Sequence, residues 1–425
     1  MGRTFFLTIL CFIVILFDTY CYYAILAVFK NWKKSTTQFF KKAWWVVNIS
    51  LIIGVFCAIY LNIFLTARAI ILVAFFLLSV GKLFMLPFLL IDDLRRLAIK
   101  LFGRKKHNRT ISQKDATPQS SPINVGEPIT RSSFLVKAGL IAGAIPLSSL
   151  SWGIISGAYD YRIKRVNLKL PNLPKAFDGI RLAQVSDIHS GSFYNKTAVK
   201  GGVDMLLAEK PDFIFFTGDL VNNLTNEVKD YQDIFSKLKA PLGVYSVLGN
   251  HDYGNYYFGQ GDSPAKRKNL QDMIAVHKIM GYDLLMNENR RLKVDSEEIG
   301  ILGIENWGMG SRFPKYGRMD LATKNTDDLP VKLLLSHDPS HWREQILPQY
   351  KQIDAMFSGH THGCQFGIRT KEFQWSPIQY VYKEWAGLYA EQQQQLYVNV
   401  GYGFLGYPGR VGILPEITIF TLSKA

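Results

Sequence analysis

Five short polar turns in the second half of the chain contain the side chains best suited to chemistry. Each turn offers imidazole, carboxylate or amide groups, and together the turns hold five of the eight histidines. In chain order they are Ser186-Asp187-Ile188-His189, Thr217-Gly218-Asp219, Gly249-Asn250-His251-Asp252, Ser336-His337-Asp338-Pro339 and Ser358-Gly359-His360-Thr361-His362-Gly363. One such residue alone is ordinarily a capping or solvated loop residue. Five clusters in succession indicate a shared site.

The residue types in these turns predict a metal site of a particular kind. Nitrogen and oxygen ligands without thiolate suit Mn, Fe, Zn or Mg better than soft metals. The four cysteines offer no alternative, because Cys11, Cys21 and Cys57 lie in apolar stretches and Cys364 stands alone. Two divalent ions about 3.5–4 Å apart can clamp the attacking and leaving oxygens of a displacement at phosphorus. We therefore expect hydrolytic chemistry on a phosphate.

The elements that position these turns are predicted to be strands of an α/β sheet. From about residue 157, short apolar β runs alternate with helical stretches, and each polar turn directly follows a β run. The predicted strands include 180–185, 213–216, 243–247, 332–335 and 353–357, with helices at about 195–209 and 227–238. Such a βαβ series implies parallel strands with right-handed crossovers. Polar groups beyond the carboxyl ends of successive strands mark the active-site edge of such a sheet.

Taken in order, the five turns resemble the motifs of the calcineurin-like metallophosphoesterase family. The resemblance covers about 157–425 and extends to Asn399-Val400-Gly401, Arg410 and Pro415-Glu416. It implies an α/β fold, a β-sandwich flanked by helices in α/β/β/α layers. It also implies a dinuclear-metal phosphoesterase that hydrolyses a phosphate ester or pyrophosphate by attack of a metal-bound hydroxide on phosphorus. Within the family, the chain is similar to the branch with N-terminal membrane segments.

The resemblance also implies a role for each site residue. The first metal would be bound by Asp187, His189 and His362, the second by Asn250, His337 and His360, and Asp219 would bridge the two. His251 would stabilise the transition state or protonate the leaving alkoxide, and Asp252 would orient His251. The cofactors would be two divalent ions, with Mn, Fe, Zn and Mg all left open.

One position departs from the family pattern. Gly-Gly-Gln often follows the last histidine in the family, whereas this chain has Gly363-Cys364-Gln365. Cysteine lacks the conformational freedom of glycine, so the geometry of this turn is the feature that the departure puts in question.

The first 156 residues are predicted to belong to a membrane. Apolar runs at about 5–29, 44–66 and 69–91 are each near the roughly 20 residues that a spanning helix needs. Residues 1–92 are therefore expected to form transmembrane helices. Lys82 inside the third run is costly unless it snorkels or finds a partner. A basic linker is expected at 93–133, and its first half could form a basic amphipathic helix on an anionic leaflet. A fourth apolar segment follows at 134–156 and either spans the membrane or lies at its interface.

The distribution of positive charge predicts an orientation for these segments. The loop after the first run is basic, the loop after the second run carries only Arg68, and residues 93–133 are again basic. Basic loops favour the cytoplasm. This places the amino terminus outside, and the catalytic domain as well if 134–156 crosses. Residues 130–135 resemble a twin-arginine export signal with its second arginine replaced, and equally an ordinary helix start. The export signal would fit that location. We expect a multi-pass protein of the cell membrane with its catalytic domain on the extracytoplasmic side.

The charge distribution also bears on partners. Residues 1–156 hold 18 lysines and arginines against five acidic residues, whereas the rest of the chain holds 31 against 29. A nucleic-acid enzyme usually carries its basic surface on the working domain, so no nucleic-acid partner is expected. Aromatic residues in 253–258 and 373–389 could instead hold a lipid chain or a nucleobase, or simply pack a covering loop. The expected substrate is a phosphorylated small molecule or lipid.

Two other readings remain open from the sequence. A non-catalytic, metal-stabilised scaffold or binding domain tethered to the membrane would be expected to have lost ligands, but every expected ligand position is filled. A transporter role for the apolar segments has little support in helices joined by short loops with a single buried lysine.

Overall fold

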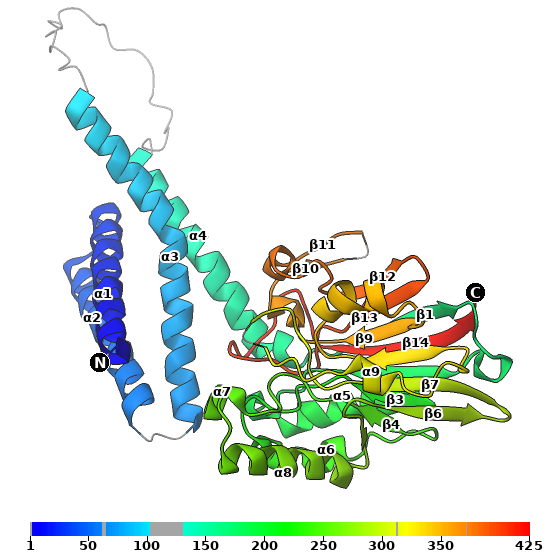
Figure 1. Cartoon of the computed structure of the whole chain (residues 1–425). Helices are drawn as coiled ribbons and strands as arrows, with labels where there is room; N and C mark the ends of the chain where they lie inside the picture. The colour runs from blue at the N-terminus through cyan, green and yellow to red at the C-terminus, as the bar shows by residue number, and fades with distance from the viewer. Residues whose placement is uncertain (1, 62–64, 103–130, 312, 371) are drawn as a thin grey trace, which may run out of the picture. The chain divides into compact units, whose positions relative to one another are not determined.

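The computed structural model describes residues 2–61, 65–102, 131–311, 313–370 and 372–425. The chain divides into two compact units, residues 1–151 and residues 152–425. They are taken in turn (Figure 1).

The first unit is helical. Its helices are α1 (Gly2–Val28), α2 (Lys34–Tyr60), α3 (Leu65–Phe102) and α4 (Arg131–Ile155). Within the described residues, four helices are long and apolar enough to cross a membrane. The last of these spans, Ser133–Tyr159, includes the fourth apolar segment of the sequence.

Helix α3 continues beyond the apolar run that predicts it. Asp92 forms ion pairs of 2.8 Å with Arg95 and with Arg96, one turn further along. Pairs at these spacings stabilise a helix, so the start of the expected linker is helical as far as Phe102. Residues 103–130 of that linker, the last of which begins the export-like segment, lie outside the described residues, and residues 131–133 belong to α4.

Polar side chains from three helices meet inside this unit. Lys82 of α3 lies 2.5 Å from the carboxylate of Asp18 in α1, and it also donates to the side-chain oxygen of Asn48 in α2. The Nζ atom of Lys82 is 5.3 Å from the centre of the Trp44 ring. Asp18 and Asn48 are buried. Lys82 therefore has the partner that its position in an apolar run requires.

The second unit contains two large mixed sheets. The first has the order β1-β14-β2-β3-β4-β5 and the second β12-β13-β9-β8-β7-β6, with a separate hairpin β10-β11. The strands are β1 (Arg162–Leu170), β2 (Arg181–Val185), β3 (Phe213–Phe216), β4 (Val244–Ser246), β5 (Asp283–Leu284), β6 (Glu288–Val294), β7 (Glu297–Gly303), β8 (Lys332–Leu335), β9 (Ala355–Ser358), β10 (Ile368–Arg369), β11 (Gln374–Trp375), β12 (Gly387–Glu391), β13 (Gln394–Val398) and β14 (Glu416–Lys424). Neighbours β2, β3 and β4 are parallel, as are β8 and β9. The parallel arrangement expected for the strands before the polar turns is confirmed.

Helices flank the two sheets. They are α5 (Lys196–Ala208), α6 (Gln232–Phe235), α7 (Asn255–Phe258), α8 (Pro264–Met280), α9 (Met319–Ala322) and α10 (Leu347–Gln349), with short 3-10 or π-helical turns η1 (Gly157–Tyr159), η2 (Lys175–Phe177), η3 (Ser190–Ser192), η4 (Thr225–Asp230), η5 (Trp342–Ile346), η6 (His362–Gln365) and η7 (Pro377–Tyr380). Helix α5 begins where expected, because the Asn195 side chain accepts a hydrogen bond of 3.0 Å from the amide of Ala198. The single helix expected at 227–238 is instead divided between η4 and α6.

Three apolar layers hold these elements together. The layer between the sheets is built from strand residues such as Phe215, Leu333 and Phe357. The outer face of the first sheet packs against α5, α6 and α8, and the outer face of the second against η5 and α9. Figure 1 shows α5, α6 and α8 together on one side of the unit. The predicted α/β/β/α sandwich is confirmed.

Candidate dinuclear metal centre

The polar turns bring two groups of metal-ligand side chains together at the sheet edges. One group is Asp187, His189 and His362, and the other is Asp219, His337 and His360. Within each group the potential ligand atoms all lie within 4.8 Å of one another. The turns follow β2, β3, β8 and β9, so the site joins both sheets. Every member is at least nine-tenths buried except His360, which is of intermediate exposure.

The first group is crowded in a way that suits a cation at its centre. The Nε2 atoms of His189 and His362 face each other at 3.0 Å, and Nε2 of His362 is 3.3 Å from a carboxylate oxygen of Asp187. On the far side of the His189 ring, Nδ1 is 3.1 Å from the side-chain oxygen of Asn222. A proton on Nδ1 shared with that oxygen leaves Nε2 free to bind a metal, as in metal-ligating histidines with an outer partner.

Asp219 lies between the two groups. Its Oδ2 atom is 3.1 Å from Nε2 of His337 and 3.5 Å from Nε2 of His189. Its Oδ1 atom accepts a hydrogen bond of 2.9 Å from the backbone amide of His251. One oxygen of Asp219 is thus held by the backbone while the other faces a histidine of each group.

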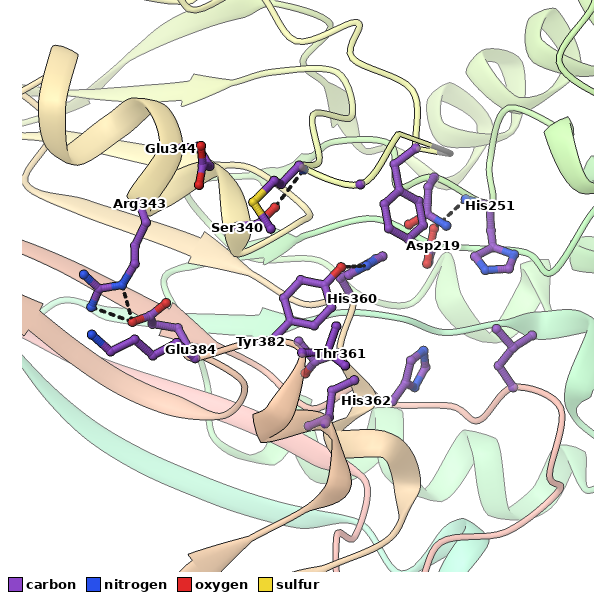
Figure 2. A pocket seen from close by; sticks show the side chains of 18 of the residues that line it. Asp219, His251, Ser340, Arg343, Glu344, His360, Thr361, His362, Tyr382 and Glu384 are labelled. Atoms are coloured by element: carbon purple, nitrogen blue, oxygen red, sulfur yellow. Dashed lines mark hydrogen bonds and ion pairs between the residues drawn. The ribbon is translucent and has the colours of Figure 1, made fainter.

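The second group carries the same type of outer support. Nδ1 of His337 is 2.7 Å from the carbonyl oxygen of Thr217, which directs Nε2 toward Asp219. Nε2 of His360 is 2.8 Å from the hydroxyl of Tyr382, as Figure 2 shows. The backbone amide of His360 donates to the carboxylate of Asp187 at 2.9 Å. That hydrogen bond ties the turn of the second group to a ligand of the first.

Asn250 supplies a direct test of whether the site fits a metal. Its side-chain nitrogen donates a hydrogen bond of 2.9 Å to the hydroxyl of Tyr256, and this bond fixes the orientation of the amide. Its Oδ1 atom is buried and has no hydrogen-bond partner among the described residues. Burying an unsatisfied polar atom is costly, and an amide oxygen is a ligand that hard divalent cations accept. The residues present therefore fit a divalent metal ion beside Asn250.

The charges of the cluster point the same way. Burial lowers the pKa of His337, but the carboxylates of Asp219 and Asp187 outweigh this effect and raise it to about 10. Burial raises the pKa of Asp187 to about 6 and lowers that of His189 to about 3. The raised pKa of His337 shows that positive charge is favoured beside Asp219, whereas burial keeps His189 neutral, the form in which a histidine binds a metal.

The backbone at the ligands is unusual. Asp187, His189, Asp219, His360 and His362 all have φ between 49° and 72°, in the left-handed region that residues with a Cβ atom rarely adopt. Strained backbone of this kind costs of the order of 1–3 kcal/mol a residue and concentrates at functional sites. Two of the turns also pack so closely that only glycine fits between them, since a Cβ atom on Gly249 would lie 2.2 Å from Oδ1 of Asp219.

His251 lies beside the clusters without belonging to either of them. Its ring is 4.9 Å from the His189 ring, and Tyr256 stacks on it at 4.3 Å. Its Nδ1 atom is 2.6 Å from the carbonyl oxygen of Asn222. That carbonyl can only accept, so Nδ1 carries a proton and Nε2 is the atom available to the cavity that His251 lines.

The expected contact between Asp252 and His251 is not found between these two described residues. The carboxylate of Asp252 instead accepts hydrogen bonds from backbone amides of Gly249, Asp219 and Leu220, at 2.8–2.9 Å. Burial raises the pKa of Asp252 to about 7. A carboxylate at the start of this tight turn is thus satisfied by the amides of the neighbouring turn. Asp252 positions the backbone of Asp219, and the Asn222 carbonyl takes the expected place beside His251.

A cavity of about 580 Å³ opens over the second group and His251. Beside the metal-ligand side chains it is lined by Tyr256, Met309, Phe313, Ile378, Val381, Tyr382 and Leu405. Arg343, Lys383, Glu344 and Glu384 also line it, and Figure 2 shows Arg343 paired with Glu384. The cavity thus combines polar ligands with a substantial apolar wall.

Sequence reasoning missed the direct partners of the site histidines. Asn222 lies three residues after Asp219 in the same turn region. The sequence gives no sign that its side chain reaches His189 while its carbonyl reaches His251. Tyr256 and Tyr382 were expected only as aromatics near the site, whereas their hydroxyls contact Asn250 and His360. Cys364 is exposed with φ of 56°, so the departure from glycine falls on a left-handed position.

Comparisons with known proteins agree with this geometry. Residues 180–364 match the calcineurin-like phosphoesterase family, and residues 2–158 match a family described as "Probable Calcineurin-like phosphoesterase, transmembrane domain". A transmembrane protein with metallophosphoesterase domain from Danio rerio is 27% identical over 282 residues, which are 64% of this chain and 60% of that protein. The uncharacterized metallophosphoesterase YkuE of Bacillus subtilis is 29% identical over 262 residues, 60% of this chain and 84% of that protein.

Among solved structures, the phosphopantetheinyl hydrolase PptH from Mycobacterium tuberculosis aligns with 48% of this chain and 89% of that chain, with 14% identity and a TM-score of 0.29. The two family matches, which follow one another along the sequence, carry the assignment. The chain belongs to the calcineurin-like metallophosphoesterases that carry an N-terminal transmembrane domain.

Proposed function

We propose that residues 157–425 hydrolyse a phosphate ester or pyrophosphate at a dinuclear divalent-metal site. The observation that carries this proposal is the position of Asp219, whose Oδ2 atom faces His189 of one ligand group and His337 of the other. Two ions held there would supply Lewis-acid activation of water and charge stabilisation at phosphorus. Asp187, His189 and His362 would hold one ion, and Asn250, His337 and His360 the other, with Asp219 shared.

The protein's own side chains would then act on the substrate. His251 keeps its Nδ1 proton on the Asn222 carbonyl and presents Nε2 to the cavity, where it would protonate the leaving oxygen. Tyr256, stacked on the ring, would limit its rotation and exclude water from one face. Asp252 would act as a positioning residue, because it holds the backbone of Asp219 and of Gly249.

We propose further that the substrate carries an apolar group, as a lipid-linked phosphate does. The support is the apolar wall of the cavity, which includes Met309, Phe313, Ile378 and Val381. Apolar walls with a few placed polar groups are typical of sites that bury most of a ligand. The scaffold reading is not favoured, because the full ligand set and His251 are present together.

A substrate panel tests the activity. The full chain in detergent, supplied with Mn²⁺, Zn²⁺ or Mg²⁺ in turn, would be offered a phosphomonoester, a phosphodiester and a lipid-linked pyrophosphate. We expect turnover of at least one substrate, fastest for the lipid-linked one, and none after chelation. The His251→Ala chain is the control for contaminating phosphatase. Turnover equal in that control, or absent with every metal, would argue against the hydrolase proposal. Faster turnover of the soluble esters would contradict only the lipid-linked substrate.

We also propose that the catalytic domain lies on the extracytoplasmic side. The support is the basic loop around 30–42 together with the basic residues of 93–133, both of which favour the cytoplasm. Four spans return the chain to the side of its amino terminus. A reporter active only outside the cytoplasm, fused after Ala425, is expected to be active. A silent reporter, with a cytoplasmic reporter active at the same junction, would place the domain inside.

A further inference from the structure

On the surface of the catalytic unit near the end of α4, a charged side chain is turned inward and its apolar neighbour is exposed. In the hairpin β10–β11, the Arg369 side chain points inward and pairs with Glu416, which is only 1% exposed. Its neighbour Ile368 is 51% exposed. Charged residues are normally at the surface and large apolar residues inside. A charge buried beneath an exposed aliphatic side chain indicates a surface that does not face bulk water.

Apolar side chains gather at this hairpin. Phe366 lies two residues before Ile368 of β10, and Phe373 directly precedes β11. Ile368 is paired with Trp375 across the hairpin, and the rings of Phe366 and Trp375 are 6.5 Å apart. Phe366 is 38% and Phe373 56% exposed. A two-stranded hairpin has no second layer to cover these side chains.

The hairpin is joined through hydrogen bonds to the last turn of α4. Phe366 and Val411 form a parallel bridge, supported by a bond of 2.9 Å from the amide of Gly367 to the carbonyl of Val411. Arg410, the residue before Val411, donates a hydrogen bond of 3.2 Å from its backbone amide to the carbonyl of Gly153. A Cβ atom on Gly153 would lie 2.6 Å from Val411. The segment Arg410–Val411 therefore connects the hairpin to the helix end, because it forms hydrogen bonds with both.

The helix end is itself apolar and exposed. Trp152 and Ile155 are 67% and 79% exposed, and Tyr194, whose hydroxyl donates 3.2 Å to the carbonyl of Ile154, is 56% exposed. The span that ends here, Ser133–Tyr159, has 27 residues. That is about 40 Å of helix at 1.5 Å a residue, longer than the roughly 30 Å hydrocarbon core. Its last turns thus belong to the headgroup region, where Trp and Tyr are enriched.

We propose that these side chains form a second membrane contact of the chain, made by the catalytic unit itself. We call it the apolar rim, and it consists of Trp152, Ile155, Tyr194, Phe366, Ile368 and Phe373. Its occupant is the headgroup and upper acyl region of the bilayer that α4 crosses. A contiguous exposed apolar surface rimmed by polar residues marks an interaction site, and continuity with the end of a membrane span identifies the lipid surface as the partner. The contact would fix the height of the catalytic unit above the bilayer. It does not depend on the hydrolytic activity.

The proposal is tested with the full chain in lipid nanodiscs. The four native cysteines are replaced by alanine, and Ile368→Cys is labelled with an environment-sensitive fluorophore. Lys293→Cys, exposed on the edge strand β6 of the second sheet, is the matched control. Lipids with nitroxides at the headgroup or shallow acyl positions are then introduced. Because interfacial segments bury apolar faces about 5–10 Å deep, we expect a blue-shifted emission at 368 and several-fold stronger quenching than at 293.

The other outcomes each overturn the proposal. A label at 368 with water-like emission and the same quenching as at 293 would show a free surface. A blue shift without nitroxide quenching would show that the rim is covered by protein, from a second copy or another chain. If the label at 368 disturbs the hairpin, Phe373→Cys in its connecting turn provides an independent position with the same two expectations.

Discussion

Each unit of the molecule buries a cluster of charged side chains, but the two clusters are satisfied to different degrees. In the helical unit, Lys82 meets one carboxylate and one amide oxygen, from Asp18 and Asn48, and the formal charges cancel. In the catalytic unit, two carboxylates and several histidines converge, two imidazole nitrogens face each other at 3.0 Å, and the buried Oδ1 of Asn250 has no partner among the described residues. The first cluster is complete as it stands, whereas the second would be completed by the cations proposed for it.

This difference separates structural from chemical use of buried charge. A closed ion pair joins helices where exposed charge would be expensive. A cluster with unmatched acceptors and strained backbone holds its ligand atoms in place before a metal arrives, which is a property of preorganised sites. The following predictions test whether the two clusters behave in these two ways.

The largest effect is expected from Asp219→Asn. Loss of the shared carboxylate charge should release metal from both ligand groups and abolish turnover, because a neutral amide replaces the ligand between the two ions. Metal content by mass spectrometry, together with turnover of the preferred substrate, measures this effect. Full retention of two ions would contradict a bridging role.

His251→Ala is expected to separate chemistry from metal binding. Metal content should stay at the wild-type value, while turnover falls by roughly two to four decades, the range for a lost general acid. The structural reason is that His251 lies outside both ligand groups and presents Nε2 to the cavity. Equal metal loss in this variant and in Asp219→Asn would contradict the division of roles.

Breaking the Lys82–Asp18–Asn48 cluster of the helical unit should lower the stability of the protein and leave its catalytic chemistry intact. Asp18→Asn leaves Lys82 charged without a counter-ion, at a cost of about 2.5–3.5 kcal/mol for a charge at the centre of a membrane helix. Thermal unfolding in detergent should show the loss, while metal content is unchanged. Combining Asp18→Asn with Lys82→Met should recover much of the stability, since removing both charges is far less costly than removing one. A double variant no more stable than the single one would show that the pair does more than join helices.

Cys364→Gly should have the smallest effect. The left-handed φ of 56° costs a non-glycine residue about 1–2 kcal/mol, and the greater backbone entropy of glycine offsets about 0.5–1 kcal/mol of the gain. The melting temperature should therefore rise slightly or not at all, with activity and metal content unchanged. Changed metal content or altered sensitivity to oxidants would reveal a ligand or redox role for the thiol.

The sequence pattern was sufficient to predict parallel strands and the turns that carry the site, whereas the two-sheet sandwich was implied by the family resemblance. Buried strands have continuous apolar runs, and polar groups directly after such runs must gather at one edge of the sheet. The left-handed backbone at Asp187 and His360 could not be predicted, because those residues give no local sign of it and the surrounding turns impose it. The partners of Asp252 were missed for a related reason. The amides that satisfy its carboxylate include those of Asp219 and Leu220, more than thirty residues earlier in the chain.

The most direct test of the central claim is the anomalous scattering of crystals of the full chain grown with Mn²⁺. We predict two anomalous peaks about 3.5–4 Å apart. One would lie at ligand distance from Asp187, His189 and His362, the other from Asn250, His337 and His360, and Asp219 would touch both. A single peak, or two peaks of which only one contacts Asp219, would contradict the dinuclear centre proposed for this protein.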